Sequence, residues 1–195
     1  MFEYIKGKVT GLSPTHIVVE AGSIGYFVHI SLTTYSSLVG EKEVLIYLHQ
    51  VVREDAHLLY GFASESERRL FRLLISVSGI GANTAIVMLS SHASDEICHA
   101  IMSEDVNFLK NIKGIGIKTA QRVIIDLKDK MDKLGHTVSE HVITGGSSSV
   151  REDALSALSA LGIVRKSAEK VVDAIIKKEV GIGVEQLIKL SLKQL

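Results

Sequence analysis

Two Gly-Ile-Gly triplets are the residues of this chain whose types and spacing could bind a ligand through the main chain. They occupy residues 79–81 and 114–116, an offset of 35 positions. Glycine has no Cβ and tolerates positive φ, so the backbone at such a turn can approach a ligand closely. When a helix begins directly after the turn, its unpaired N–H groups and the positive end of its dipole can hold a phosphate. Each triplet therefore predicts a helix, a tight glycine turn and a second helix.

The residues around the triplets repeat with the same offset. The matching pairs are Leu74 with Leu109, Val77 with Ile112, Thr84 with Thr119 and Ala85 with Ala120. A single Gly-x-Gly between helices is usually just a turn, whereas two copies in register indicate a duplicated unit. The pattern is that of a tandem helix-hairpin-helix module, which grips the backbone of duplex nucleic acid and fixes position without reading bases.

The charge of the chain is balanced, with 22 Lys and Arg against 22 Asp and Glu in 195 residues. This length has room for one large domain or for two to three small ones. No segment is strongly basic. Binding to nucleic acid must therefore come from a local patch and from backbone amides, and not from a bulk positive field.

The cellular compartment is predicted from three features. Cys98 is the single cysteine, which excludes an internal disulfide and fits a reducing environment, and a small buried hydrophobe is its preferred interpretation. The N-terminus has no apolar core of signal-peptide length. The uncharged stretch 73–94 approaches the roughly 20 residues of a membrane span, but Gly79 and Gly81 would break it midway. We therefore expect a cytoplasmic, soluble protein.

Residues 1–63 alternate in the manner of strands, at 4–12, 16–21, 25–30, 43–52 and 57–62, with a short helix near 32–38. This order predicts an OB-type barrel. Several aromatic residues of the segment could stack on single-stranded bases, but core packing is the preferred interpretation. They include Tyr26, Phe27, Tyr47, Tyr60 and Phe62.

The rest of the chain is predicted to be helical. Ser64 or Ser66 can cap the first helix of a domain at 64–134, which holds both hairpins. A flexible linker is expected at 135–150, where Gly145 and Gly146 precede three serines. Residues 151–195 predict three short amphipathic helices, broken at Gly162 and at 181–183. The fold class is thus multidomain α+β, with a barrel, a tandem hairpin domain and a tethered three-helix bundle.

The whole chain resembles the RuvA family of Holliday junction-binding proteins. The resemblance rests on the Val-Val-Arg-Glu-Asp-Ala hairpin at 51–56, the Leu-Tyr-Gly-Phe strand at 59–62, the Gly-Tyr turn at 25–26, both glycine triplets and the C-terminal helices. It implies a non-catalytic homotetramer without a cofactor or metal. Such a tetramer holds a four-way junction open while RuvB ATPase rings pull DNA through two arms. RuvC resolvase and a second, facing tetramer are further partners that the resemblance allows.

The resemblance also assigns roles to residues. An acidic pin falls on Glu54 and Asp55, which the sequence alone would place in a solvated loop, with Arg53 beside them. DNA contacts fall on Gly79, Ile80, Gly81, Asn83, Thr84, Gly114, Ile115, Gly116, Lys118, Thr119 and Arg122. Apolar positions of the C-terminal helices exceed the needs of so small a bundle, and a face for the motor partner is expected at Leu158, Leu161, Val172 and Ile175.

The chain departs from the family pattern at two turns. It has Ala82 and Asn83 where the family usually has Pro-Lys, and Ile117 before Lys118 where the family usually has two lysines. Two cations per subunit are therefore missing, which makes contacts more dependent on backbone amides.

Two rival functions stay open. One is a structure-specific nuclease or glycosylase that docks through the same hairpins, and the other is a duplex-binding module without junction preference. No Gly-x-x-x-x-Gly-Lys-Ser/Thr loop occurs, so no nucleotide-driven motor is expected. The His and Cys residues lack the spacing of a zinc site and are interpreted as ordinary polar surface. They are His92, Cys98, His99, His136 and His141.

Overall fold

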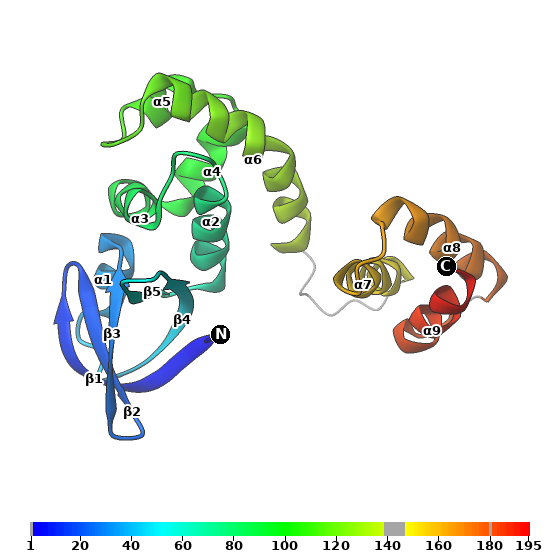
Figure 1. Cartoon of the computed structure of the whole chain (residues 1–195), viewed down its shortest axis with the longest axis horizontal. Coiled ribbons are helices and arrows are strands. Elements are labelled where there is room, and N and C mark those ends of the chain that lie inside the picture. The colour runs from blue at the N-terminus through cyan, green and yellow to red at the C-terminus, as the bar shows by residue number, and fades with distance from the viewer. Residues whose placement is uncertain (1, 139–146, 180) are drawn as a thin grey trace. The chain divides into compact units, whose positions relative to one another are not determined.

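The chain folds into two compact units, Met1–Val138 and Ser139–Leu195. The computed structural model describes residues 2–138, 147–179 and 181–195 (Figure 1). Within the first unit, the barrel and the hairpins pack together in one body. The sequence had suggested separate domains at 1–63 and 64–134.

The N-terminal half of the first unit is a closed five-stranded barrel with the strand order β1-β2-β3-β5-β4. Its elements are β1 (Tyr4–Ser13), β2 (His16–Ala21), β3 (Ile24–Ile30), α1 (Leu32–Leu38), β4 (Glu43–Val52) and β5 (His57–Phe62). All neighbours pair antiparallel except β3 and β5, which are parallel. The predicted OB-type barrel is confirmed by this topology. It was predictable because the alternation of apolar and polar residues marks each strand directly.

The barrel interior is filled by alternate side chains of the strands. Gly61 lies where a Cβ would come within 2.6 Å of methyl groups of Ile46 and Val28, so only glycine fits there. Tyr60 and Phe62 are buried, as core packing predicts, whereas Phe27 is 50% exposed and stacks on His16 with ring centroids 4.4 Å apart.

Helices α2 to α6 form the other half of this unit. They are α2 (Glu65–Ile75), α3 (Ala82–Ser91), α4 (Ser94–Met102), α5 (Val106–Lys110) and α6 (Ile117–Val138). Ser64 is the N-cap of α2, and its hydroxyl accepts from the Glu67 backbone N–H at 3.2 Å. Of the two caps that the sequence allowed, the structure therefore uses Ser64.

Buried polar side chains of α2 join it to the barrel. The Glu67 carboxylate accepts from the Ser31 hydroxyl at 2.7 Å and from the Thr34 hydroxyl at 2.8 Å. Arg68, only 2% exposed, donates to the Glu3 carbonyl at 2.8 Å and pairs with the Glu3 carboxylate. Since the buried charges of Glu67 and Arg68 are costly to leave without their partners, these contacts fasten α2 to the barrel.

The second unit contains α7 (Ser147–Ala160), α8 (Arg165–Lys178) and α9 (Val184–Gln194) around a small core of its own. The breaks fall where the glycines predicted them, since Gly162 and Gly181 have φ values of 86° and 84°. Both ends of the linker predicted at 135–150 are helical, because α6 reaches Val138 and α7 starts at Ser147. The central part of that linker, including Gly145 and Gly146, lies outside the described residues. In the described parts of the chain, no helix has the length and apolarity needed to cross a membrane.

Candidate nucleic-acid interface

The two glycine turns have the same backbone hydrogen bonds, shifted by the sequence offset. Each turn is closed by a bond inside it, and the helix that follows begins with a bond to the carbonyl of the last glycine. The bonds are Ile80 N to Val77 O (3.1 Å) and Ala85 N to Gly81 O (3.0 Å) in the first turn, and Ile115 N to Ile112 O (3.0 Å) and Ala120 N to Gly116 O (2.9 Å) in the second. The duplication inferred from the sequence is therefore a duplication of geometry.

The two glycines of a triplet have different roles. Gly79 and Gly114 adopt φ values of 97° and 91°, which favour glycine. Gly81, the N-cap of α3, has φ −89°, which any residue can adopt. A Cβ on Gly81 or Gly116 would nevertheless meet no protein atom within 4 Å. The second glycine therefore faces open space beside the unpaired N–H groups of a helix start.

Ile80 and Ile115 are each 5% exposed, which assigns their side chains to the core. They were predicted as DNA-binding residues together with the glycines. Only their backbone can meet a phosphate, and the side chains anchor the turns to the helices below.

The two turns lie against each other. A Cβ on Gly79 would be 4.0 Å from Thr119 Oγ1, and one on Gly114 would be 3.8 Å from Thr84 Cγ2. Arg122 of α6 donates to the carbonyl of Ser78 in the first turn at 3.4 Å. The predicted contact residues of both hairpins thus meet in one surface.

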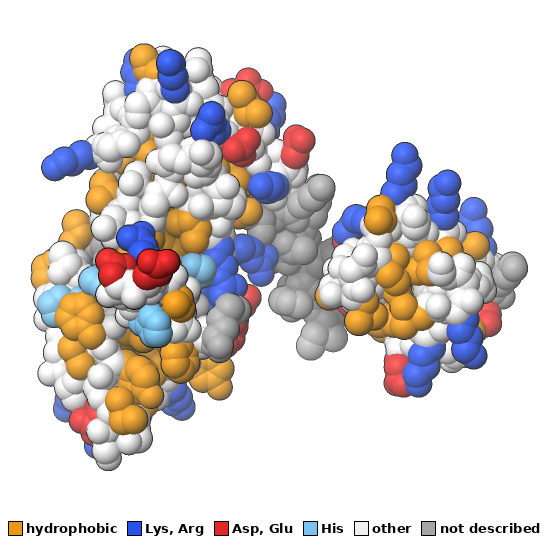
Figure 2. Space-filling view, viewed as in Figure 1, with side chains coloured by type: hydrophobic (Ala, Val, Ile, Leu, Met, Phe, Trp, Pro, Cys, Tyr) orange, Lys and Arg blue, Asp and Glu red, His pale blue; other side chains and the backbone are white. Residues whose placement is uncertain are grey.

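Cations are distributed unequally between the turns. At four equivalent positions the second hairpin carries an exposed Lys or Arg where the first carries a neutral residue. The pairs, first hairpin then second, are Ile75 with Lys110, Ser78 with Lys113, Asn83 with Lys118 and Val87 with Arg122. Lys110 and Lys113 are not among the contact residues predicted from the sequence, although the repeat offset identifies both positions. Figure 2 shows separate Lys and Arg side chains over α5 and α6 and no continuous basic band.

The predicted acidic pin lies at the tip of the β4–β5 hairpin. Val52 pairs with His57 across the hairpin, and Arg53 N donates to Ala56 O at 2.8 Å to close the turn. Glu54 and Asp55 are exposed there, and Figure 2 shows acidic side chains together on this face.

The residues predicted to meet a motor partner are mostly inside the second unit. Leu158 and Val172 are 0% exposed and Ile175 is 4% exposed, because they form the core of its three helices. These three side chains cannot touch a partner while the unit is folded, which corrects the assignment. Leu161 is 63% exposed.

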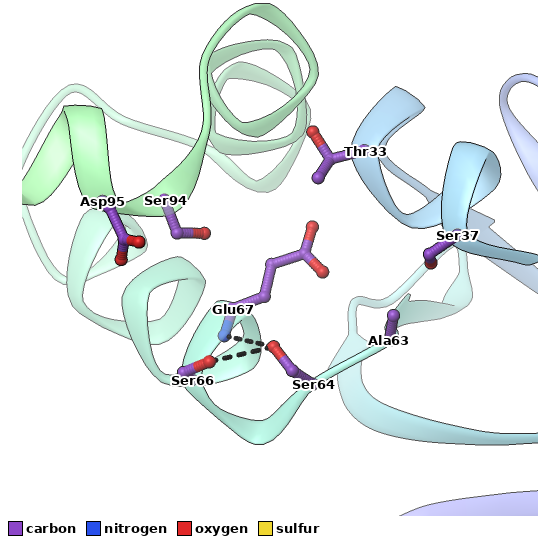
Figure 3. A pocket seen from close by; sticks show the side chains of 8 residues that line it. All are labelled: Thr33, Ser37, Ala63, Ser64, Ser66, Glu67, Ser94 and Asp95. Atoms are coloured by element: carbon purple, nitrogen blue, oxygen red, sulfur yellow. Dashed lines mark hydrogen bonds between the residues drawn. The ribbon is translucent and has the colours of Figure 1, made fainter. Parts of the chain in front are cut away.

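The polar pocket in Figure 3 lies between α1, α2 and α4. It is lined by Thr33, Ser37, Ala63, Ser64, Ser66, Glu67, Ser94 and Asp95. Its buried carboxylate is already committed to Ser31 and Thr34. The pocket is therefore part of the joint between barrel and hairpins.

Cys98 is half-buried against the Met131 sulfur at 3.9 Å, and burial raises the pKa of its thiol. The Nδ1 atom of His92 lies 3.8 Å from Oε2 of Glu96. Within the described ranges, no three His, Cys, Asp or Glu side chains are grouped so as to hold a metal ion. The His136 side chain and His141 lie outside that description.

Comparison with known proteins covers the chain from end to end. Three family models match it: RuvA N terminal domain at residues 1–61, SAM-like helix-hairpin-helix tandem at 71–129 and RuvA C-terminal domain at 149–195. Similar proteins occur in Christiangramia forsetii (49% identical over 196 residues), Bacteroides thetaiotaomicron (47% over 201) and Flavobacterium psychrophilum (49% over 195). Each comparison spans 100% of both chains, and each relative is named Holliday junction branch migration complex subunit RuvA.

Proposed function

The chain belongs to the RuvA family, and from this we propose that it binds four-way DNA junctions regardless of sequence. It is the DNA-binding, non-catalytic subunit of a branch migration complex that serves recombination and repair. As such a subunit it acts in the cytoplasm with the DNA.

The observation that carries this proposal is the pair of glycine turns in one surface. Each turn presents unpaired N–H groups beside open space, at Gly81 and at Gly116. Backbone donors of this kind bind phosphate without reading bases. The four cations of the second hairpin, Lys110, Lys113, Lys118 and Arg122, add attraction that a neutral chain otherwise lacks.

The acidic hairpin tip supports a preference for junctions over plain duplex. In a fourfold assembly, Glu54 and Asp55 of every subunit would gather at the crossover. Their charges repel phosphates, which disfavours continuous duplex through the centre and helps to separate strands.

Assembly and partners belong to the same proposal. Large apolar side chains on the barrel surface are exposed, which favours burial between subunits of a homotetramer; they include Phe2, Tyr4, Ile24, Phe27 and Leu45. Hydrophobic side chains are visible over the barrel in Figure 2. The second unit is proposed to meet the RuvB ATPase through its own exposed apolar residues, Leu161, Val164, Leu192 and Leu195. RuvC resolvase and a second tetramer are the further partners.

The rival enzyme function is not favoured. A nuclease or glycosylase could share the hairpins, but the RuvA models also match the barrel and the C-terminal helices that flank them. The relatives are named as branch migration subunits over their whole length.

A competition experiment tests the function. A labelled four-way junction is mixed with the full chain and Mg²⁺, and unlabelled linear duplex is added in increasing excess. We expect the junction to stay bound and intact. Equal competition by linear duplex would instead indicate a general duplex-binding module, and cleavage of the junction would indicate an enzyme. Light scattering with and without junction measures the assembly.

A further inference from the structure

A side-chain hydrogen bond connects the start of α3, directly after the first glycine turn, to the barrel. The Tyr60 hydroxyl of β5 donates to Asn83 Oδ1 at 3.1 Å. Asn83 is the second residue of α3, directly after the N-cap Gly81 and Ala82. It is exposed, whereas Tyr60 is only 2% exposed. A buried residue of the barrel thus fixes the orientation of a side chain on the proposed DNA surface.

Tyr60 is well suited to hold this position. Its ring packs on Phe71 of α2 and on His29 of β3, with centroids 5.4 Å apart in both cases. Burial raises the pKa of its phenol, so the hydroxyl keeps its proton and remains a donor. The hydroxyl therefore requires an acceptor, and the amide oxygen of Asn83 is that acceptor.

The oxygen of the Asn83 carboxamide can only accept, so the side chain donates to other partners through its nitrogen alone. Among the described residues, Asn83 Nδ2 has no hydrogen bond to a protein acceptor. This nitrogen carries two N–H donors and sits in the first turn of α3, where backbone N–H groups are also unpaired. The site thus offers an oriented neutral donor beside the backbone donors.

We propose that Tyr60 is a positioning residue that orients Asn83 to donate from Nδ2 to a DNA phosphate at the first hairpin. This role rests on the proposed function, and it specifies how the first hairpin, which is neutral at these positions, would hold a phosphate. The equivalent position in the second hairpin is Lys118. One hairpin therefore holds phosphate with an oriented amide and the other with the Lys118 ammonium.

The salt dependence of binding separates these two kinds of contact. A lysine that neutralises a phosphate releases counterions, so its loss lowers the slope of log K against log salt by about 0.9 per contact. An amide releases none. We expect Asn83→Ala to weaken junction and duplex binding by about threefold or more at every salt concentration, with an unchanged slope. Lys118→Ala is the matched comparison and should lower the slope.

A double-mutant cycle tests the positioning role. Tyr60→Phe keeps the ring and removes the hydroxyl, so it should weaken binding in the wild-type chain and have no further effect in the Asn83→Ala background. Asn83→Asp keeps an acceptor for Tyr60 but replaces the donor with a negative charge, so it should bind more weakly than Asn83→Ala. Thermal midpoints of all variants report folding.

The outcomes are distinguishable. Equal loss from Tyr60→Phe in both backgrounds would reduce Tyr60 to a structural residue and overturn the inference, as would full affinity in Asn83→Ala or Asn83→Asp. If Gly81→Val and Lys118→Ala also left binding unchanged, the proposed function itself would fail.

Discussion

In each glycine turn, the first glycine is required by the backbone conformation and the second leaves room for a ligand. Gly81→Val and Gly116→Val should weaken DNA binding at least tenfold while leaving the fold intact, because the new side chain fills space that no protein atom occupies. Gly183→Val is the matched control. Gly183 is also a helix N-cap in open space, with φ −75°, but it lies in the second unit. Fluorescence anisotropy and thermal midpoints measure the two effects. Equal affinities of the three variants would remove the hairpin assignment.

Gly114→Val should differ from Gly116→Val in stability. Gly114 has φ 91°, and a branched side chain there costs about 1–3 kcal/mol. We therefore expect Gly114→Val to lower both the melting temperature and the DNA affinity. An unchanged melting temperature would contradict the strain that φ implies.

The acidic pin gives a prediction of specificity. Replacing Glu54 with Gln and Asp55 with Asn removes phosphate repulsion, so binding to linear duplex should rise several-fold while junction binding holds or tightens. Competition gels across a range of salt measure the ratio. A double variant that bound duplex no better than wild type would show that both residues belong to an ordinary solvated loop without a role in specificity.

How far the sequence predicts the residues of this site depends on their separation along the chain. The triplets and their threonines follow from a local repeat, and even Lys113 could have been found in that way. The contact between Tyr60 and Asn83 joins a residue of a strand to a residue of a helix, and the sequence periodicities of these two elements differ. No local sequence pattern predicts such a hydrogen bond, because it forms only when the barrel and α3 have packed together.

Among the elements, α2 is the joint of the first unit, and one histidine of β4 makes that joint sensitive to pH. Burial, then Arg72 and Arg68, lower the pKa of His49, and Arg72 Nε donates to its Nδ1 at 3.4 Å. The unfolded chain therefore takes up this proton at a higher pH than the folded chain. The resulting stability is complete above the ordinary histidine pKa of about 6.5 and is lost as pH falls from there through the lower pKa of His49 in the folded chain.

The variant His49→Gln keeps an acceptor for Arg72 and does not titrate. We expect the melting temperature of the wild type to fall more steeply between about pH 7.5 and 5.5 than that of the variant, since this window lies around the ordinary histidine pKa. Parallel curves would exclude His49 as a source of the pH dependence. Because His29 also has a pKa lowered by burial and by His16, some dependence should persist in the variant.

Element boundaries were predictable where periodicity is strong, and the packing between elements was not. The strands at 16–21, 43–52 and 57–62 begin and end as expected. The packing of α2 on the barrel was not predicted, because Glu67 and Arg68 are charged residue types that usually face solvent. Their burial depends on partners in α1 and at Glu3, which sequence spacing does not reveal.

At the scale of the whole molecule, the two units have separate cores. A chain truncated after Val138 should keep tetramer formation and junction binding nearly intact and lose stimulation of the RuvB motor. Light scattering, gel shifts and branch migration rates measure these three properties. Branch migration at full rate would remove the partner role from the second unit, and loss of junction binding would assign it a part in holding DNA.

The contacts of the turns are reciprocal, Gly79 toward Thr119 and Gly114 toward Thr84, as they would be in two hairpins related by an approximate twofold axis. Duplex DNA has twofold axes of its own, since its strands run in opposite directions. If the turns bind DNA as proposed, main-chain donors with this symmetry would meet the same backbone whichever end of an arm arrived first. We therefore expect them to have no polarity, so that an arm could be drawn outward or returned without new contacts having to form.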